Sequence, residues 1–590
     1  MTNPLALTDV SPPIRWVINR LSRLDTLKQW YDEWLAGNGG DAADFLDYTL
    51  DKTGINFDVL NESLLNNVAQ DKPIVFVANH PLGGLEGMLL SRLLLRYRPD
   101  LKVLTNQMLL CFKEFNELFI GVDVLNPNKQ AENAKGMRLI AKHLGKGGAL
   151  LVFPSGTVGH IQVPQVFTKH WTVTDAPWQD IVGRLAMKYK AECVPIYVSG
   201  KNTRAFYLTG LIHARLRTLL LPRAMIAKQN ESIQATIGEP IILEKGKMTP
   251  EAATDYLRLA CEFLADDNAA FTVEQAAKKK VKSLATSTSS PEAIQNHLTA
   301  MGEYCVLTRG DFKVYVAPYA ALGPIAQLLA VEREHTFRAI GEGTGLVRDV
   351  DRFDEDYDHI FIWDTQQSAL VGGYRAANVK HLVDKKGLKG LYSYSLFAYD
   401  KRLLATLGGS IEVGRSFITP VYQRDGIALD TLWCGLGHYL LQHPQCHTLF
   451  GCVSISQTFA PIARAVLVDA LLEGYGADDK TRALVKAHSP FTFKARFWSK
   501  ELITTFANFS IINKLLGQGA YQQRVPALIR HYAALKGKFI DFSVNHGFSQ
   551  SLDGLIYVDL RQTPERYLKR YLGADGAELF KTRWQQKNAA

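Results

Sequence analysis

Short apolar runs alternate with segments of helical spacing over the first half of the chain. Apolar residues fill nearly every position of 74–78, 149–153 and 194–198, which is typical of buried strands. Helices are predicted between and after these strands at Met88–Tyr97, Ala131–Leu144, Ile181–Tyr189 and Pro250–Ala265. The alternation predicts an α/β sheet domain over residues 71–270.

An amphipathic helix is predicted ahead of this domain, over Ile14–Leu35. Trp16 and Trp34 belong to its apolar stripe, and arginines lie elsewhere on its surface. The stripe fits a helix packed on a core, and it also fits a helix on a membrane surface with its tryptophans at headgroup level. In residues 211–225 basic residues alternate with leucines, which makes a second candidate for membrane contact. We therefore predict that residues 1–70 form a helical region with a candidate membrane-surface contact.

The composition changes between the two halves. Residues 276–291 are first basic, then rich in serine and threonine, and then reach a proline, which is linker composition. We place the linker at 271–300 and a second domain at 301–590, with an insertion near 476–520. Strands of the second domain are predicted at 304–308, 312–316, 359–363, 369–376, 392–399 and 409–417, before a helix at 426–442 and a strand at 448–453. The expected fold class is therefore α/β with two domains, the second of mixed α/β type.

Charge and composition limit the partners. The chain of 590 residues has 67 Lys and Arg against 58 Asp and Glu, so its net charge is +9, and 47% of its residues are hydrophobic. A chain of this composition can build packed cores, which excludes disorder throughout. The mild positive charge suits an anionic partner and leaves nucleic acid, an anionic membrane surface and an acidic carrier protein open.

The sequence shows no targeting or metal-binding signal. Residues 1–13 have no basic segment followed by an apolar one, so we expect no signal peptide. No apolar run approaches the roughly 20 residues that span a bilayer, so we expect no transmembrane helix. Cys446, His447 and Cys452 lie near His443 in the sequence, but without a CxxC pair we expect ordinary packing and no metal.

A histidine and a glutamate flank the turn after the strand at 74–78. His80 stands at the strand end beside Gly83 and Gly84, where an α/β sheet exposes its ligand site. Glu86 follows on the first turn of a helix, from which its carboxylate can reach one imidazole nitrogen and fix the tautomer. The other nitrogen can then take a proton from a hydroxyl group. The alternative is a turn histidine that caps the helix, with Glu86 as an ordinary first-turn acid.

This region resembles the glycerophospholipid (lysophosphatidate-type) acyltransferase family. The family's first motif is a histidine and an acid, and the longer spacing here resembles the branch that includes ornithine-lipid O-acyltransferases. The resemblance implies that His80 is the catalytic base and that Glu86 orients it. The acceptor-binding third motif, F-P-E-G-T, is matched by Phe153, Pro154, Ser155, Gly156 and Thr157. Because Ser155 replaces the acid and Val158 the following arginine, we expect an acceptor without a phosphate.

A turn in the second half resembles the pantetheine-pyrophosphate loop of the GNAT acyltransferases. It fits Q-x-x-G-x-A with Gln423, Arg424, Gly426 and Ala428, and it opens a predicted helix after a strand. Backbone N–H groups at a helix N-terminus can hold a phosphate, and a glycine permits its close approach. The loop is therefore predicted to bind the phosphopantetheine of an acyl donor.

Two charged residues precede this loop on the predicted strand. The GNAT resemblance places Glu412 and Arg415 near the splayed strand pair where such enzymes bind donor thioester and amine. An amine must lose a proton before it attacks, so Glu412, directly or through water, is the candidate catalytic base. The alternative is a strand carboxylate paired with Arg415.

Six acidic residues lie between Arg348 and His359. They either attract a dicationic or amine-bearing small substrate or form a solvated acidic loop. This half is similar to the ornithine N-acyltransferases, and more distantly to acyl-homoserine-lactone synthases, through D-x-D-x-F-D at 349–354, V-G-x-Y-R at 371–375, E-x-G-R-S at 412–416 and F-G-C at 450–452. The resemblance implies substrate-binding roles for Asp349, Asp351, Asp354, Asp358, Arg375, Arg415 and Ser416.

The order of the two halves resembles the bifunctional ornithine-lipid synthases. The resemblance implies that the C-terminal half transfers a 3-hydroxyacyl chain to the α-amine of ornithine or a related amino acid, and that the N-terminal half then esterifies the 3-hydroxyl. It implies an acyl-carrier-protein or acyl-CoA donor, no permanently bound cofactor, no nucleic-acid partner, and a peripheral place at the cytoplasmic face of the inner membrane. Two alternatives stay open: a lysophospholipid acyltransferase fused to a GNAT domain of unrelated substrate, and an inactive membrane-surface binding protein.

Overall fold

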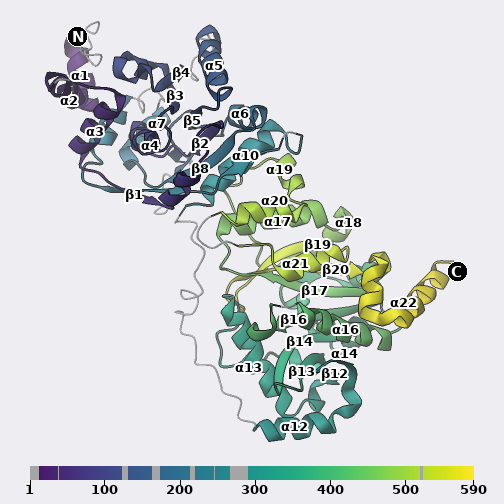
Figure 1. Cartoon of the computed structure of the whole chain (residues 1–590). Coiled ribbons are helices and arrows are strands. Elements are labelled where there is room, and N and C mark those ends of the chain that lie inside the picture. Colours follow the sequence, from purple (N-terminus) through teal and green to yellow (C-terminus); the bar gives the residue numbers. More distant parts are fainter. Residues whose placement is uncertain are drawn as a thin grey trace. The chain divides into compact units, whose positions relative to one another are not determined.

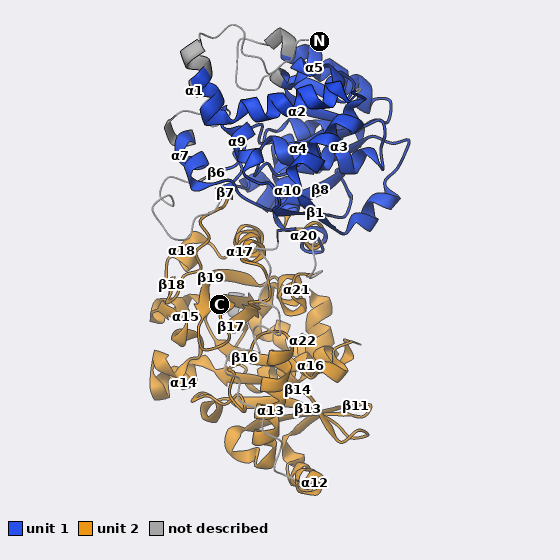
Figure 2. Cartoon of the chain, turned by 90° about the vertical axis from the view of Figure 1, so that its left-hand side faces the viewer, with its two compact units in different colours: residues 1–268, 497–505, 514–522 blue, residues 269–496, 506–513, 523–590 orange. Residues whose placement is uncertain are grey.

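The chain folds into two compact units, shown in Figure 2. Unit 1 holds residues 1–268, 497–505 and 514–522, and unit 2 holds residues 269–496, 506–513 and 523–590. The structure is a computed structural model. It describes residues 12–37, 39–122, 130–161, 173–212, 219–244, 246–265, 290–424, 426–518 and 523–589.

Unit 1 is built on an eight-stranded sheet with the order β1-β9-β8-β2-β5-β3-β4 and β10 beside β8. The strands are β1 (Asn56–Leu60), β2 (Ile74–Ala78), β3 (Lys102–Asn106), β4 (Phe119–Val122), β5 (Ala149–Val152), β8 (Glu192–Val198), β9 (Ser232–Ile237) and β10 (Ile241–Ile242). The pairs β8–β2, β2–β5 and β5–β3 are parallel. The turns that follow these strands therefore meet at one edge of the sheet, where α/β proteins bind ligands.

Helices cover both faces of this sheet (Figure 1). The helices are α1 (Pro12–Ser22), α2 (Leu24–Ala36), α3 (Ala42–Thr53), α4 (Gly84–Leu95), α5 (Gln130–Leu144), α6 (Ile181–Tyr189), α7 (Arg204–Ile212), α9 (Leu221–Ile226), α10 (Pro250–Glu262) and α19 (Lys500–Thr505). β6 (His160–Ile161) and β7 (Val173–Thr174) form a separate antiparallel pair, and the N–H of Gly159, just before β6, donates to the His80 carbonyl at 2.7 Å. Ile74 and Phe76 share a buried cluster with Leu89 of α4, whereas α10 contacts β2 and β8 and donates the Cys261 thiol to the Val77 carbonyl.

The predicted helix over Ile14–Leu35 is two helices. Arg23 adopts a left-handed backbone conformation with φ +56°, which ends α1 and starts α2 at the next residue. The Ser22 hydroxyl donates to the carbonyl of Ile18 and accepts from the N–H of Leu24, so a polar side chain satisfies backbone groups at the break. Helical spacing in the sequence continues across this break and therefore did not reveal it.

Two segments from the last fifth of the sequence pack within unit 1. The N–H of Ser499 donates to Asp255 on α10 at 2.6 Å, and α19 contacts α10. The amide oxygen of Gln518 accepts from the N–H of Glu239 at 2.8 Å. The prediction that 301–590 forms one domain with an insertion near 476–520 therefore needs correction. The partners of the first contact are separated by 244 positions in the sequence, and those of the second by 279 positions. No local sequence pattern predicts contacts over such separations.

Unit 2 is built on a second eight-stranded sheet with the order β11-β12-β13-β14-β16-β17-β20-β19. The strands are β11 (Cys305–Arg309), β12 (Phe312–Pro318), β13 (Asp358–Asp364), β14 (Ala369–Asn378), β16 (Ser410–Ile418), β17 (Thr448–Ile455), β19 (Lys538–Asn545) and β20 (Ser551–Asp559). Each neighbouring pair is antiparallel except β16–β17, which is parallel.

The helices and a small strand pair complete unit 2. They are α12 (Pro291–Ala300), α13 (Pro324–Ala339), α14 (Val379–Lys386), α15 (Lys401–Leu407), α16 (Ile427–Gln442), α17 (Pro461–Tyr475), α18 (Asp479–Arg482), α21 (Ala527–Ala534), α22 (Glu565–Ala589) and the part of α20 (Phe509–Leu516) that precedes residue 514, with β15 (Phe397–Tyr399) paired to β18 (Val485–Ala487). α16 packs on β12, β13 and β14, whereas α13 contacts β14 and β16. Both the mixed sheet and the α/β class agree with the prediction.

The two parallel strands of unit 2 separate near their carboxyl ends. β16 and β17 pair only from Ser410 opposite Thr448 to Val413 opposite Gly451. Immediately afterwards β16 carries an extra residue relative to β14, and Arg415 has φ +52°. Such a bulge bends a strand and re-aims its side chains. The bulge therefore lies where the pairing between β16 and β17 stops.

Two predicted boundaries in unit 2 are wrong. The linker was expected to reach residue 300, but 291–300 form α12, which Ser290 caps through the N–H of Ala293. Residues 271–289 of the predicted linker lie outside the described residues. The strand expected at 392–399 is confined to 397–399, and residues 393–395 form a turn of 3₁₀ helix.

Candidate active sites

His80 and Glu86 come together at the carboxyl end of β2. The Nδ1 atom of His80 lies 3.0 Å from Oε1 of Glu86. The same oxygen accepts hydrogen bonds from the N–H groups of Leu82 (2.9 Å) and Gly83 (2.8 Å). The Glu86 side chain is fully buried, whereas that of His80 is 18% exposed. A carboxylate facing Nδ1 makes Nε2 the basic nitrogen, so the arrangement suits proton transfer at Nε2.

The turn that carries His80 is held by two asparagines. Asn79 exchanges two hydrogen bonds with the backbone of Val198, at 2.9 and 2.7 Å. The side-chain amide of Asn202 donates to the carbonyls of Pro81 and Leu82. Residues from the end of β8 therefore fix the position of the turn after β2.

The predicted acceptor motif, residues 153–157, follows β5, which is the neighbour of β2. The Phe153 ring lies 4.7 Å from the imidazole of His80, centre to centre. Gly156 has φ +62°, and its N–H donates to the carbonyl of Phe153, which closes the turn. The Ser155 hydroxyl is nearly buried and donates to the Thr157 carbonyl at 2.9 Å, while the Pro154 carbonyl accepts from a backbone N–H at residue 179. The structure thus brings this motif beside His80.

Asp175 supports the backbone of His80, and sequence reasoning missed it. Both carboxylate oxygens of Asp175 accept from the N–H of His80, at 3.1 and 3.3 Å, and one also accepts from the Trp178 indole. Burial raises the pKa of Asp175 above its ordinary value. Arg258 donates to the Asp175 carbonyl and lies 4.0 Å above the ring of Phe497. Phe497, from the last fifth of the sequence, is thus connected to His80 through three successive contacts.

A pocket opens in unit 2 where β16 and β17 part. It encloses about 470 Å³, including space open to solvent. Its lining residues are Phe337, Tyr374, Tyr392, Gly414, Arg415, Ser416, Cys452, Val453, Ser454, Leu528, Phe548 and Asp553. Of the predicted substrate-binding residues, Arg415 and Ser416 line this pocket directly.

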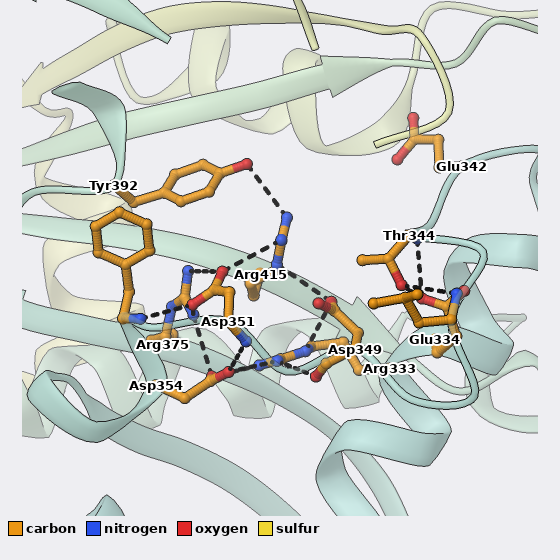
Figure 3. A network of polar contacts seen from close by, with 12 residues as sticks. Arg333, Glu334, Glu342, Thr344, Asp349, Asp351, Asp354, Arg375, Tyr392 and Arg415 are labelled. Atoms are coloured by element: carbon orange, nitrogen blue, oxygen red, sulfur yellow. Dashed lines mark hydrogen bonds and ion pairs between the residues drawn. The ribbon is translucent and has the colours of Figure 1, made fainter. Parts of the chain in front are cut away.

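The predicted acidic loop forms a buried ion-pair network with arginines, shown in Figure 3; its members are Arg333, Arg375, Arg415, Asp349, Asp351 and Asp354. Arg415 contacts Asp349 (3.1 Å) and Asp351 (3.3 Å). Arg375 contacts Asp351 (2.6 Å) and Asp354 (3.1 Å). Burial alone would raise the pKa of Asp354, but the neighbouring guanidinium groups outweigh it and hold that pKa well below its ordinary value. We call this set the Arg–Asp network.

The network corrects both interpretations of the acidic loop. Asp349 is fully buried and Asp354 is 2% exposed, so neither is a solvated acid. Their carboxylates face guanidinium groups, which leaves neither in a position to contact a substrate. Asp358 accepts from the Tyr439 hydroxyl on α16 at 2.9 Å and does not line the pocket. Among the predicted acids, Asp351 keeps the most exposure within the network, at 22% of its side chain.

Glu412 is buried beneath the turn at 393–395. Its carboxylate accepts from the N–H groups of Tyr392 (3.0 Å) and Ser393 (2.8 Å) and from the Tyr357 hydroxyl. Only 1% of the residue is exposed, and burial raises the pKa of its carboxylate. The alternative of an ion pair with Arg415 is also wrong, because Arg415 pairs with the network. The geometry therefore favours a structural carboxylate over a base that touches the amine.

The predicted phosphopantetheine loop lies at the start of α16. Gly426 adopts φ +70° and precedes Ile427, the first residue of the helix, without a side-chain cap. The side chain of Gln423 donates to the Ile418 carbonyl at 2.7 Å and so ties the loop to the end of β16. Arg424 is exposed and Ala428 is buried. Residue 425 lies outside the described residues.

Two buried acids beside the pocket were not predicted. Glu342 lies between Gly341 and Gly343, which both have positive φ, and Asp553 lies on β20. The sequence offered one signal for Glu342, an acid enclosed by glycines before the acidic loop. Asp553 gave none, because only the pairing of β17 with β20 brings it to Ser454.

The described residues contain no group of three or more His, Cys, Asp or Glu side chains that could hold a metal ion. His443 contacts the Tyr439 carbonyl, and the Cys446 thiol donates to the Ser410 carbonyl. His447 lies near Asp559. None of the helices that the structure describes is both long and apolar enough to cross a membrane.

The two units of the chain match different protein families. Residues 45–273 match the family described as Acyltransferase, and residues 333–434 match the family described as Acetyltransferase (GNAT) domain. The chain is a two-domain acyltransferase. This confirms the predicted order of an acyltransferase domain before a GNAT domain. The first match begins at residue 45, earlier than the predicted boundary at 71.

Several curated relatives resemble parts of the chain. A glycine N(alpha)-acyltransferase of Phocaeicola vulgatus is 27% identical over 250 residues, which cover 40% of this chain and 76% of the relative. A lyso-glycine lipid O-acyltransferase of Bacteroides thetaiotaomicron is 24% identical over 234 residues, 36% of this chain and 81% of the relative. An L-ornithine N(alpha)-acyltransferase of Brucella abortus is 26% identical over 304 residues, 49% of this chain and 98% of the relative. The acyltransferase therefore resembles proteins named for both N- and O-acylation of aminolipids.

Proposed function

We propose that this acyltransferase makes an aminolipid in two steps. The GNAT domain would transfer a 3-hydroxyacyl chain to the α-amine of ornithine or a related amino acid, and the acyltransferase domain would esterify the 3-hydroxyl group. The observation that carries this proposal is the likeness of one chain to relatives named for each step. Glycine and ornithine both occur in those names, so both belong in the test.

The site at His80 supports the second step. An alcohol must lose its proton as it attacks a thioester, and an imidazole oriented by a carboxylate supplies such a base. The FPSGT turn beside it carries no charged side chain, and its serine hydroxyl is bonded to the backbone. These features suit an acceptor hydroxyl on a lipid without a phosphate.

The pocket at Arg415 supports the first step. It opens at the parting of β16 and β17. The next helix along the chain, α16, offers backbone N–H groups at its N-terminus that suit a phosphate. The donor is an acyl thioester, on acyl carrier protein or CoA; an acidic carrier protein suits the net charge of +9. Assays of the purified chain with each donor distinguish the two.

We also propose that unit 1 binds a membrane surface, at the cytoplasmic face of the inner membrane. Trp16 is 63% exposed and Leu21 is 48% exposed on α1, and the Arg20 guanidinium lies over the Trp16 ring. α1 contacts α9, which includes the described end of the second membrane candidate at 211–225; residues 213–218 of that candidate lie outside the described residues. Exposed aromatic and basic residues on one short helix suit a membrane interface.

Expression in a bacterial host without aminolipids, followed by lipid mass analysis, tests the proposal. The wild-type chain should produce a phosphorus-free diacylated aminolipid. The His80→Ala variant should accumulate the monoacyl amide instead, while His335→Ala, which removes an exposed histidine, should match the wild type. A new phospholipid, or an unchanged lipid profile, would contradict the proposal.

A further inference from the structure

Two buried carboxylates in unit 2 have hydrogen bonds only from neutral groups. Glu342 is 4% exposed, and its Oε2 accepts from the Ser454 hydroxyl at 2.8 Å. Asp553 is also 4% exposed, and its oxygens accept from the amide of Asn545 (2.7 Å) and the hydroxyl of Ser551 (3.4 Å). Across the described residues, neither acid forms an ion pair with a lysine, arginine or histidine. A buried carboxylate without a cation is costly, so the pair calls for a positively charged partner.

The neighbouring arginines do not supply that partner. The Arg–Asp network contains three arginines and three aspartates, so its charges balance without Glu342 or Asp553. Arg415, the member that lines the pocket, already pairs with Asp349 and Asp351. The network therefore provides no ion pair that would hold either of the two acids beside the pocket in its ionised form.

Both acids lie at the parting of the strands. Ser454 of β17 is opposite Asp553 of β20 in the strand pairing, and both residues line the pocket. The hydrogen bond from Ser454 brings Glu342 to the same place from the loop after α13. In Figure 3 the carboxylate of Glu342 points into the space above Arg415, toward which the Tyr392 hydroxyl also points.

We propose that Glu342 and Asp553 bind the ammonium group of the acceptor amino acid, and that Glu342 takes its proton before the nitrogen attacks the donor. This inference rests on the proposed N-acylation and deepens it. An ammonium group is the cation that the acceptor brings, and two carboxylates with neutral partners satisfy its charge and its N–H donors. The free amine that results can attack the thioester carbonyl.

The step balances in atoms and charge. One proton passes from the ammonium to the carboxylate of Glu342 and afterwards to solvent. The nitrogen lone pair forms the C–N bond to the thioester carbonyl carbon, and the C–S bond breaks. The nitrogen loses a second proton, which the departing thiolate takes, so the products are an amide and a free thiol.

The surroundings of Glu342 suit a proton acceptor better than those of Glu412. Three hydrogen-bond donors stabilise the charged form of Glu412. Glu342 has a single donor among the described residues, the Ser454 hydroxyl. Burial raises the pKa of Glu342 to about 8; Asp553 raises it further, while Ser454 and Arg415 act in the opposite direction. A carboxylate with this raised pKa is a stronger base than an ordinary glutamate, whose pKa is about 4.3, so it takes a proton from an ammonium group more readily.

N-acylation by the full chain, with an acyl thioester donor and either glycine or ornithine, tests this role. Glu342→Gln should lower kcat by about 10²-fold or more, because it cannot accept the proton. Its rate should keep rising with pH as the free amine accumulates, whereas the wild-type rate should level off above the pKa of Glu342. Asp553→Asn should mainly raise the KM for the amino acid. Glu303→Gln removes an exposed acid of the same unit and should match the wild type.

A second variant covers the case in which Glu342→Gln folds poorly. Ser454→Ala removes the hydrogen bond that favours ionised Glu342, so the acidic limb of the pH–rate profile should move to higher pH. A wild-type profile in both Glu342→Gln and Ser454→Ala would overturn the proton-acceptor role. Loss of the acidic limb in Asp553→Asn alone would transfer that role to Asp553 and overturn the assignment to Glu342.

Calorimetric titration of the full chain with glycine and ornithine separates this inference from the proposed function. Weaker binding to Glu342→Gln and Asp553→Asn than to the wild type supports the ammonium site, even if the wild type forms no amide. Equal binding to all three proteins, in a wild type that does form the amide, removes the site and leaves N-acylation in place.

Discussion

The imidazole of His80 and the carboxylate of Glu86 face each other across one turn, with 3.0 Å between Nδ1 and Oε1. The same carboxylate oxygen holds the N–H groups of Leu82 and Gly83. Glu86 therefore shapes the turn and orients the imidazole at the same time. Different substitutions of Glu86 can therefore separate its effect on the turn from its effect on the imidazole.

Glu86→Gln should slow O-acylation by about 10–10²-fold with little loss of stability. The amide oxygen can still accept from Leu82 and Gly83, but its neutral charge no longer stabilises a protonated imidazole. Glu86→Ala should also unfold more readily, because each buried N–H group left without an acceptor costs about 1–3 kcal/mol. Steady-state kinetics and thermal melting measure both effects, with the exposed Glu117→Gln as control. Wild-type turnover in Glu86→Gln would argue against the orienting role.

Phe497→Ala should weaken O-acylation although the residue is 417 positions from His80 in the sequence. Its ring supports Arg258, which holds the Asp175 carbonyl, and Asp175 holds the N–H of His80. We expect a several-fold fall in the esterification rate and unchanged amide formation, measured by the ratio of monoacyl to diacyl lipid. Phe491→Ala removes a similar ring beneath Arg464 in unit 2 and should leave esterification intact. Equal ratios in Phe497→Ala and the wild type would contradict the chain of contacts.

Gly451→Ala should damage N-acylation and destabilise unit 2. A Cβ atom at this position would lie 2.1 Å from the carbonyl oxygen of Val413, at the last paired position of β16 and β17. The strands would have to move apart just before the pocket. Gly302→Ala is the control, because a Cβ atom there meets nothing within 4 Å. A wild-type melting temperature and rate in Gly451→Ala would show that the strands tolerate the wider spacing.

Glu342→Gln should make the protein more stable at pH 8 than the wild type, with a smaller difference at pH 5. The pKa of Glu342 is raised from 4.5 to about 8 in the folded state, so the stability that its protonated form contributes is lost as pH rises from about 4.5 through 8. Glutamine removes this dependence because it does not ionise. Calorimetric melting across this pH range measures the effect, and Glu303→Gln serves as control. Parallel pH profiles for Glu342→Gln and the wild type would show that Glu342 is ionised at neutral pH.

Replacing both Trp16 and Leu21 by serine should reduce binding to vesicles that contain anionic lipid. The two exposed side chains supply the apolar contact at the membrane interface. Co-sedimentation with vesicles measures binding, and activity on a detergent-dispersed acceptor should persist. Leu60→Ser with Leu139→Ser removes two other exposed leucines of the same unit and should bind like the wild type. Equal binding of both double variants would place the membrane contact elsewhere.

The site of unit 1 could be predicted because its chemistry is local. His80 and Glu86 are six positions apart, and a buried strand, a glycine turn and a helix start dictate how they meet. The FPSGT turn follows the neighbouring strand, so the same edge of the sheet receives it. Asp175 and Phe497 gave no such signal, because their partners are distant in the sequence and meet them only in the folded chain.

The site of unit 2 was predicted in part. The GNAT order of strands and the loop before α16 were recognisable, and the pattern located Arg415 and Ser416 at the parting of the strands. The environment of Glu412 was not predictable, because backbone groups at 392–393 rather than a neighbour on its own strand hold its carboxylate. The acidic loop was interpreted as exposed, since the sequence cannot show that three arginines pair with three of its six acidic residues.

The sequence by itself determined the fold class, the order of the two acyltransferase domains and the turn that carries His80. Apolar periodicity and turn-forming residues depend on near neighbours in the sequence, so they can be recognised from the sequence alone. Only the tertiary structure decided which carboxylates have arginine partners and which do not. Ser454 and Asp553 are 99 positions apart, and they meet with Glu342 only because β17 pairs with β20 and the loop after α13 returns to that edge. The charge that a buried acid carries depends on such distant neighbours, and for that reason its chemistry is settled by the fold.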